Sequence, residues 1–212
     1  MLDQMANSLW IDTSGAYCSL GLKVSEREFV SAEYLNRAHN QKLLGSLDEL
    51  FKRANIKPRE LDVVGFACGP GSFTGVRMAA SAVQAIAAAA ECGVVPVTTS
   101  QALFESVNLD GPVVCAIKSR GEAYYLCRPE SEHELFDSCP DWISGAEYLV
   151  GECPGWWPQE VAVEKVHSDP NILVRYVESQ HLRGLAKSPE LALPMYFSGD
   201  SPWKTVSERA VG

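Results

Sequence analysis

The sequence predicts an α/β fold in which a mixed β-sheet is covered by helices. Three observations lead to this fold class: a run of three strand-like segments at the start, a leucine-bearing helical segment after them, and then buried strands that alternate with helices. The chain has 212 residues, of which 46% are hydrophobic and 21% are charged. This composition is typical of a globular protein with a substantial core.

The first three strand-like segments form a predicted meander. Residues 8–12 are a short apolar run that ends at a polar turn, and residues 17–22 follow as a second strand. Because the turn between them is short, the two strands are expected to pair antiparallel. A third strand is predicted over residues 27–34.

Helices and strands alternate after the meander. Apolar residues recur at helical spacing over residues 39–54, and residues 61–68 form a continuous apolar strand of the kind that is buried on both faces of a sheet. An alanine-rich helix over residues 76–91 and a short strand over residues 94–97 come next. A meander followed by helix, strand, helix and strand is the order of the ribonuclease-H-like and actin-like ATPase folds.

The second half of the chain gives a weaker signal and is predicted to form a smaller lobe. The expected elements are a helix over 100–107, strands over 113–117 and 123–127, a loop over 153–158 and a helix over 171–182. Asp110-Gly111-Pro112 marks a boundary between the halves. We therefore divide the chain into a first lobe of residues 1–108 and a second lobe of residues 109–212.

Charge, cysteine content and apolar segments narrow the function classes. The net charge is −9, so the chain lacks the positive field with which proteins bind nucleic acid directly, and any contact with nucleic acid is expected only through a partner. Seven single cysteines without C-x-x-C spacing argue against a disulfide framework and a zinc site. The first residues lack the basic region of a signal peptide, and the apolar stretch 78–90 is too short to cross a bilayer. We therefore expect a cytoplasmic location and no membrane contact.

The sharpest local signal is the glycine-rich segment from Gly69 to Gly75, which leads into the alanine-rich helix. Ser72 or Thr74 can cap that helix, and glycines before a helix N-terminus are also typical of anion sites, where Arg77 would add charge. No Gly-Lys-Ser/Thr follows the glycines, so the segment is not a Walker A loop. A structural turn is the more frequent meaning of such a segment.

A second candidate lies where the first strand ends, at Asp12-Thr13-Ser14. A carboxylate followed by hydroxyl groups at this place can hold a metal–phosphate group in an actin-like ATPase. The alternative is an ordinary hairpin in which Asp12 bonds to the amides of the turn. Asp12, Gly71, Ser72 and Arg77 together make a candidate for a vestigial phosphate site.

No assembled active site is visible in the sequence. The four histidines stand apart, without an H-x-x-x-H pair that would place two metal ligands on one helical face. His167 adjoins Ser168 and Asp169, but adjacency in sequence is not the geometry of a catalytic triad. Trp156 and Trp157 are predicted to cover the core and not to stack on bases. We therefore expect no catalytic and no metal-binding residues.

Several segments together resemble the TsaB family. They are Ile11-Asp12-Thr13-Ser14 with Cys18-Ser19-Leu20, Arg37-Ala38-His39 before the leucine-rich helix, the run from Gly69 to Arg77, and Leu193-Pro194-Met195-Tyr196. The resemblance spans nearly the whole chain and is thinnest between residues 121 and 190. Members of this family are dimerisation subunits of the complex that makes threonylcarbamoyladenosine in tRNA, and they are related to the glycoprotease fold.

The resemblance implies an actin-like (ASKHA) fold of two lobes, each with a mixed sheet flanked by helices, the second lobe being reduced. It also implies a non-catalytic subunit that forms a heterodimer with the catalytic threonylcarbamoyltransferase paralogue, with a small ATPase subunit as a third member. The helices over 39–54 and 76–91 are the implied pairing surface. The contact residues expected within it are His39, Leu43, Leu47, Met78, Ala82 and Ala85. We expect no cofactor for the chain alone, and ATP or ADP is the ligand to seek at the interface of the complex.

Three alternatives stay open at this point. The first is a nucleotide hydrolase or phosphotransferase that uses Asp12, the Gly69–Gly75 loop and Arg77. The second is a glycoprotease-type peptidase, which needs a metal pair or a nucleophile–base pair. The third is a homodimer of the isolated chain through an exposed apolar helical face. Lys118 stands where relatives usually carry an aspartate, and we expect it to change the charge of the cleft.

Overall fold

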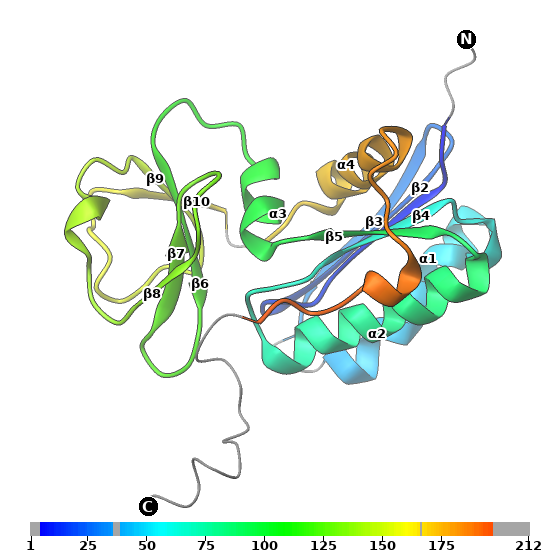
Figure 1. The fold of residues 1–212 in the computed structure, drawn as a ribbon, viewed down its shortest axis with the longest axis horizontal. Helices are drawn as coiled ribbons and strands as arrows, with labels where there is room; N and C mark the ends of the chain where they lie inside the picture. The colour runs from blue at the N-terminus through cyan, green and yellow to red at the C-terminus, as the bar shows by residue number, and fades with distance from the viewer. Residues whose placement is uncertain (1–4, 36–38, 166, 197–212) are drawn as a thin grey trace, which may run out of the picture.

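The computed structural model describes residues 5–35, 39–165 and 167–196, apart from the side chains of residues 39–41 and 165. It contains two five-stranded mixed sheets that stand side by side, each with helical segments packed on it (Figure 1). This arrangement confirms the predicted α/β fold with two lobes, of which the second carries fewer helices.

The first sheet has the strand order β3-β2-β1-β4-β5. Its strands are β1 (Ser8–Asp12), β2 (Tyr17–Val24), β3 (Arg27–Tyr34), β4 (Val63–Ala67) and β5 (Gly93–Val97). β2 pairs antiparallel with both β1 and β3, which confirms the predicted meander. β4 and β5 extend the sheet in parallel with β1, because each is reached through a helix that crosses over the sheet.

Helices cover both faces of the first sheet. On one face lie α1 (His39–Ala54) and α2 (Phe73–Ala90), and on the other lies α4 (Pro170–Leu182) (Figure 1). The sheet lets α4 approach closely at Gly65, where an added Cβ would lie 2.1 Å from Val177 Cγ2. The first sheet is therefore the middle layer of a three-layer core.

The helix α2 has a defined start and end. The Ser72 hydroxyl accepts a hydrogen bond from the Gly75 amide at 3.3 Å, and Glu91 adopts the left-handed conformation after the last turn. The whole helix α2 is long and apolar enough to cross a membrane, judged by length and composition alone. The stretch 78–90, on which the expectation from the sequence rests, is too short to do so. One such helix is weak evidence for a membrane span, and here Ala79, Val83 and Ala87 are buried in the core beneath α2.

The second sheet has the strand order β10-β9-β6-β7-β8. Its strands are β6 (Val113–Lys118), β7 (Tyr124–Cys127), β8 (Glu134–Phe136), β9 (Tyr148–Gly151) and β10 (Ala162–Lys165). One face packs against α3 (Thr99–Glu105), and the other is covered by loops that carry Trp156 and Trp157. The prediction that these two tryptophans cover the core is confirmed. Single turns of 3₁₀-helix at 58–60, 141–143 and 189–191 complete the described elements.

The chain enters the second sheet after α3 and comes back to the first sheet with α4 (Figure 1). Residues 170–182 therefore pack on the first sheet, although the division into residues 1–108 and 109–212 assigned them to the second lobe. The boundary near residue 108 stays a prediction, with the correction that α4 belongs in space to the first sheet. Side-chain contacts explain this, because α4 supplies Leu173, Val174 and Val177 to the core of that sheet.

Candidate functional site

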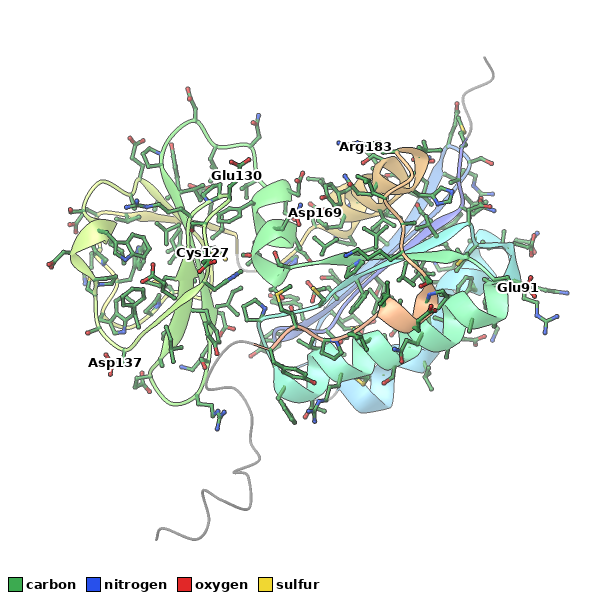
Figure 2. The ribbon with its side chains drawn as sticks, viewed as in Figure 1. Glu91, Cys127, Glu130, Asp137, Asp169 and Arg183 are labelled. Atoms are coloured by element: carbon green, nitrogen blue, oxygen red, sulfur yellow. The ribbon has the colours of Figure 1, made fainter. Side chains whose placement is uncertain are left out.

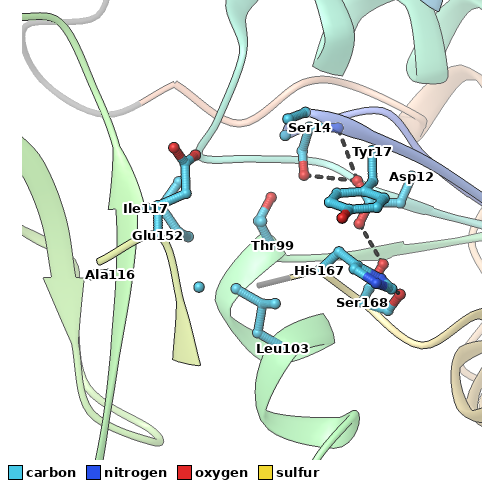
Figure 3. A pocket seen from close by; sticks show the side chains of 13 residues that line it. Asp12, Ser14, Tyr17, Thr99, Leu103, Ala116, Ile117, Glu152, His167 and Ser168 are labelled. Atoms are coloured by element: carbon cyan, nitrogen blue, oxygen red, sulfur yellow. Dashed lines mark hydrogen bonds between the residues drawn. The ribbon is translucent and has the colours of Figure 1, made fainter. Parts of the chain in front are cut away.

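A cleft of about 410 Å³, including the space at its mouth, opens between the two sheets (Figure 3). It lies where β1 of the first sheet and β6 and β9 of the second sheet end, so the carboxyl ends of three strands meet there. The lining residues are Asp12, Ser14, Gly15, Ala16, Tyr17, Thr99, Leu103, Ala116, Ile117, Gly151, Glu152, His167 and Ser168. This cleft is a candidate for a ligand site.

Asp12 lies in this cleft, but hydrogen bonds within the chain engage its carboxylate. Oδ1 accepts from the amide and the hydroxyl of Ser14 at 2.8 and 2.7 Å, and Oδ2 accepts from the Ser168 hydroxyl at 2.5 Å (Figure 3). The side chain is buried, with 6% of its surface exposed. The hairpin alternative for Asp12 thus describes its actual contacts: it organises the turn after β1 and joins that turn to the segment before α4.

His167 and Ser168 do not form a catalytic pair with each other. The Ser168 hydroxyl bonds to Asp12, whereas His167 Nδ1 lies 2.9 Å from the Ser168 backbone oxygen. The His167 ring stacks against Tyr17, with ring centroids 4.3 Å apart. The prediction that adjacency at this place does not make a triad is confirmed by these contacts.

The glycine-rich loop packs against the Asp12 turn. An added Cβ at Gly75 would lie 1.9 Å from the Thr13 backbone oxygen, and one at Gly71 would lie 2.5 Å from the Ser14 backbone oxygen. The Ser72 amide donates to that Ser14 oxygen at 2.6 Å. The glycines are therefore required for close approach between two backbone segments of this chain, which supports the structural-turn alternative.

Arg77 is held at the surface away from the cleft. Its guanidinium lies 3.6 Å from the centroid of the Phe73 ring, and its Nε donates to the Tyr196 hydroxyl at 2.6 Å. Of the four residues of the predicted phosphate site, only Asp12 lines the cleft. Gly71 and Ser72 pack against the Ser14 backbone behind it, and Arg77 contacts Phe73 and Tyr196. The four residues do not converge on one site, and nucleotide binding by this chain stays a prediction.

Two cleft residues were missed by sequence reasoning. Thr99 is buried, and its hydroxyl has no hydrogen-bond partner among the described residues. Burial raises the pKa of Glu152, which follows β9, and the charge of Lys118 opposes that shift. No pattern in the sequence marks either residue, because Thr99 sits in a turn-to-helix segment and β9 is a short strand in the region of weakest pattern. No group of three or more candidate metal ligands was found within the described residues.

Lys118 does not line the cleft, contrary to our expectation. Its ammonium group lies 3.2 Å from the Tyr124 hydroxyl and 5.0 Å from the centroid of the Tyr124 ring, to which it is attracted. It acts on the cleft residue Glu152 through its charge and through a hydrogen bond from its backbone, both of which lower the pKa of Glu152.

The predicted pairing surface on α1 and α2 is partly used by this chain itself. Leu43 and Leu47 are 2% and 4% exposed and belong to the core, so they offer no surface to a partner. The helical spacing predicted that these leucines share one face of α1, but it did not show whether that face packs on this chain's own sheet or on a partner. Leu44 is 74% exposed instead. Met78 and Ala82 are half-buried at the margin of the core, Ala85 is exposed, and the side chain of His39 lies outside the described residues.

Comparisons with known proteins agree with this fold and with the resemblance in the sequence. The family model described as TsaD, tRNA N6-adenosine threonylcarbamoyltransferase, matches residues 30–156, which is more than half of the chain. The tRNA threonylcarbamoyladenosine biosynthesis protein TsaB of Haemophilus influenzae is 34% identical over 122 residues, or 56% of this chain and 51% of the relative. The protein of the same name from Escherichia coli is 26% identical over 92% of this chain and 96% of its own length.

Solved structures extend the likeness to three dimensions. YeaZ from Pseudomonas aeruginosa superimposes with a TM-score of 0.77 at 26% identity, and the match covers 91% of this chain and 100% of that one. In the Haemophilus alignment the chain spans about half the length of the relative, whereas the YeaZ match is essentially complete. The chain therefore belongs to the family described as tRNA N6-adenosine threonylcarbamoyltransferase, and within it to the TsaB proteins that its sequence resembles.

Proposed function

We propose that this chain is a non-catalytic partner subunit in the biosynthesis of threonylcarbamoyladenosine in tRNA. It acts by forming a heterodimer with the catalytic threonylcarbamoyltransferase paralogue, with a small ATPase subunit as a third member and tRNA held only through the complex. The observation that carries this proposal is the match to the Escherichia coli TsaB protein over 92% of the chain, at 26% identity. Family membership over residues 30–156 supports it.

The exposed face shared by α1 and α2 suits a helical partner. Leu44 stands out on α1 as an exposed leucine among leucines that are otherwise buried. On α2, Met78, Ala82 and Ala85 follow one another at helical spacing and are half-buried or exposed. Small side chains let a second helix come close, and Leu44 would then bury its apolar surface against the partner.

The contacts of Asp12 and of the glycine-rich loop support a scaffold role. The carboxylate and the loop backbone that would face a nucleotide in an actin-like ATPase are engaged here with Ser14, Ser168 and Thr13. Phosphate binding at this loop would require these contacts to be given up. The chain is therefore better suited to presenting a rigid surface to a partner than to turning over a nucleotide on its own.

Size-exclusion chromatography with light scattering, on the chain alone and mixed with the catalytic paralogue of the same organism, tests the proposal. We expect a stable heterodimer. Ala85→Arg places a charged, long side chain on the pairing surface and should weaken the heterodimer by about a hundredfold or more. Leu135→Arg is the matched control, because Leu135 is also exposed and apolar but lies on β8 of the second sheet.

The outcomes separate the proposal from its alternatives. Absence of a complex at micromolar concentrations, with or without ATP, would contradict the heterodimer. If Ala85→Arg and Leu135→Arg weaken the heterodimer equally, the pairing surface does not lie on α1 and α2. A homodimer of the isolated chain that survives Ala85→Arg would mean that self-association uses another face.

A second candidate function, binding of a nucleotide in the cleft, is favoured by Thr99. Its buried hydroxyl is unpaired within the described residues and lines the cleft, and such groups usually have a hydrogen-bond partner. Calorimetric titration of the chain and of its heterodimer with ATP and with ADP tests this candidate. Weaker binding by Thr99→Val with retention by Thr99→Ser would support it. ATP turnover that is lost in Asp12→Ala would favour the hydrolase alternative over the scaffold.

A further inference from the structure

Two cysteines of the second sheet face each other across neighbouring strands. Cys115 on β6 and Cys127 on β7 are direct partners in the antiparallel register, so their side chains emerge on the same face. Directly opposed residues of such a pair have Cα atoms about 4.5–5.5 Å apart, within the roughly 4.4–6.8 Å that a disulfide bridges. Both cysteines carry free thiols and belong to the cluster that packs against α3.

A histidine and a serine complete the surroundings of Cys127. The Cys127 thiol interacts by side-chain hydrogen bonds with Cys115, His133 and Ser100. The Ser100 hydroxyl in turn lies 2.8 Å from His133 Nε2. Ser100 comes from α3 and His133 from the segment between β7 and β8, so three separate parts of the chain converge on one sulfur atom.

These surroundings shift the pKa values of the two thiols in opposite directions. The hydrogen bond from Cys115 is the largest influence that lowers the pKa of Cys127, and the hydrogen bond and charge of His133 act in the same direction. Burial and the contact with Cys127 raise the pKa of Cys115. Cys127, which has His133 and Ser100 beside it, is therefore the better placed of the two thiols to attack an oxidant first.

We propose that Cys115 and Cys127 form a dithiol that hydrogen peroxide oxidises reversibly to a cross-strand disulfide. In the first step the Cys127 sulfur attacks one peroxide oxygen, its proton passes through His133, and the O–O bond breaks to release water. In the second step the Cys115 sulfur attacks the sulfenic acid on Cys127, the S–O bond breaks, and its proton leaves with the second water. Two thiols lose two electrons, and one peroxide becomes two waters.

Burial selects the oxidant and distinguishes this pair from the other thiols. Cys115 and Cys127 are 0% and 3% exposed, so a peroxide close to water in size suits them better than a protein disulfide does. Burial raises the pKa of Cys18 to about 12 and that of Cys68 to about 11, which leaves these two thiols protonated and slow to react. Cys139 is exposed and has no such surroundings among the described contacts.

The modification would lie directly behind the wall of the cleft. Cys115 precedes Ala116 and Ser100 follows Thr99, and both neighbours line the cleft. Figure 2 labels Cys127 within the second sheet, beside α3. The inference does not depend on the proposed partner function, because it concerns only contacts within this chain.

Peptide mapping without reduction tests the inference on the full-length native protein. The folded chain is treated with hydrogen peroxide, blocked with iodoacetamide and digested with trypsin and a glutamate-specific protease. This digestion separates Cys115 on peptide 106–118 from Cys127 on peptide 123–130, so only a disulfide can join them. We expect the joined peptide with a mass about 2 Da below the sum of the two reduced peptides, and its loss on treatment with dithiothreitol.

Variants supply the control and the role of His133. Cys139→Ser should leave formation of the joined peptide unchanged, and His133→Gln should slow it about tenfold or more. An unchanged rate in His133→Gln would overturn the proposed proton path. The inference as a whole is overturned if the native protein gives no joined peptide while Cys139 is oxidised, or if the link forms only after denaturation. Because the mapping uses the unaltered chain, a variant that fails to fold does not affect this result.

Discussion

At the scale of single residues, two glycines that both lie in helices differ in whether a larger side chain would fit at their position. Gly75 is pressed against the Thr13 backbone, with no room for a Cβ, whereas an added Cβ at Gly45 meets nothing within 4 Å. Gly45 sits within α1, where glycine costs conformational entropy. The same residue type is thus required at one position and unfavourable at the other.

A matched pair of substitutions follows from this contrast. Gly75→Ala should lower the free energy of unfolding by about 2 kcal/mol or more, because the Thr13 backbone must move. Gly45→Ala should raise it by about 0.5–1 kcal/mol. Urea denaturation followed by circular dichroism measures both values. A Gly75→Ala protein as stable as the parent would contradict the close packing of the loop against the Asp12 turn.

Glu152 gives a pH dependence whose sign is fixed. The pKa of Glu152 in the folded chain is raised, so the folded state favours the protonated carboxyl group. The contribution of Glu152 to stability is therefore lost as pH rises from the ordinary carboxyl range through the raised pKa. Glu152→Gln has no carboxyl group to ionise, so it does not lose this stability as pH rises. We expect the variant to be slightly more stable than the parent at neutral pH and equal to it at about pH 4. Thermal unfolding across this range measures the difference, and an equal gain at both pH values would contradict the explanation.

At the scale of elements, two ion pairs fasten α4 to the meander of the first sheet. Lys23 on β2 meets Glu178 at 2.7 Å, with both side chains 12% exposed. Glu28 on β3 receives two hydrogen bonds from the Arg175 guanidinium at 2.5 and 2.6 Å, which lower the pKa of Glu28. Glu178 also accepts from the Ala6 amide. Water screens the partly buried Lys23–Glu178 pair less than the Glu28–Arg175 pair, in which Arg175 is exposed.

Removing one member of the Lys23–Glu178 pair should therefore destabilise the fold. Glu178→Ala leaves the partly buried Lys23 without its direct partner and should cost about 1 kcal/mol or more of unfolding free energy. The double variant Lys23→Met, Glu178→Leu should recover most of that loss, because no charge remains unpaired. Denaturant titration of the four proteins in a mutant cycle measures the coupling. Equal stability of the single and double variants would contradict a buried charge as the cause.

Elements marked by apolar spacing or by turn residues could be predicted, whereas three short strands of the second sheet could not. The meander, α1, α2 and α4 were predicted within a few residues, because apolar spacing and turn residues mark them clearly. The strands β8, β9 and β10 have three or four residues each and were missed. The position of β9 depends on pairing with β6, which is distant in sequence, and that of β10 depends on pairing with β9. A local pattern carries no such information.

Of the candidate site, the sequence predicted the turn after the first strand, where Asp12 and Ser14 line the cleft. The sequence grouped Asp12 with the glycine-rich loop, but the loop serves the turn and does not face the cleft. Thr99, Glu152 and Ser168 reach the cleft from three other segments, and only the arrangement of the two sheets brings them together. Leu43 and Leu47 show the converse, since a correct helical pattern did not reveal that they face this chain's own core.

At the scale of the whole molecule, the net charge of −9 predicts how the chain behaves toward tRNA. Without a positive field, the isolated chain should give no shift of tRNA in native gel electrophoresis at about 150 mM salt. The heterodimer with the catalytic paralogue should give a shift under the same conditions. Tight binding of tRNA by the isolated chain would contradict the proposal that tRNA is held only through the complex.

The return of α4 to the first sheet also orders events during synthesis. The five strands of that sheet, together with α1 and α2, are complete when residue 97 has been made, yet their other face is covered mainly by residues 170–182. At ordinary rates of translation the ribosome needs roughly ten seconds to make the intervening chain. Throughout that interval Trp10, Val63 and Val95 stay uncovered on the nascent chain. The second sheet is thus synthesised while the first still exposes an apolar face, on which a chaperone can bind before α4 displaces it.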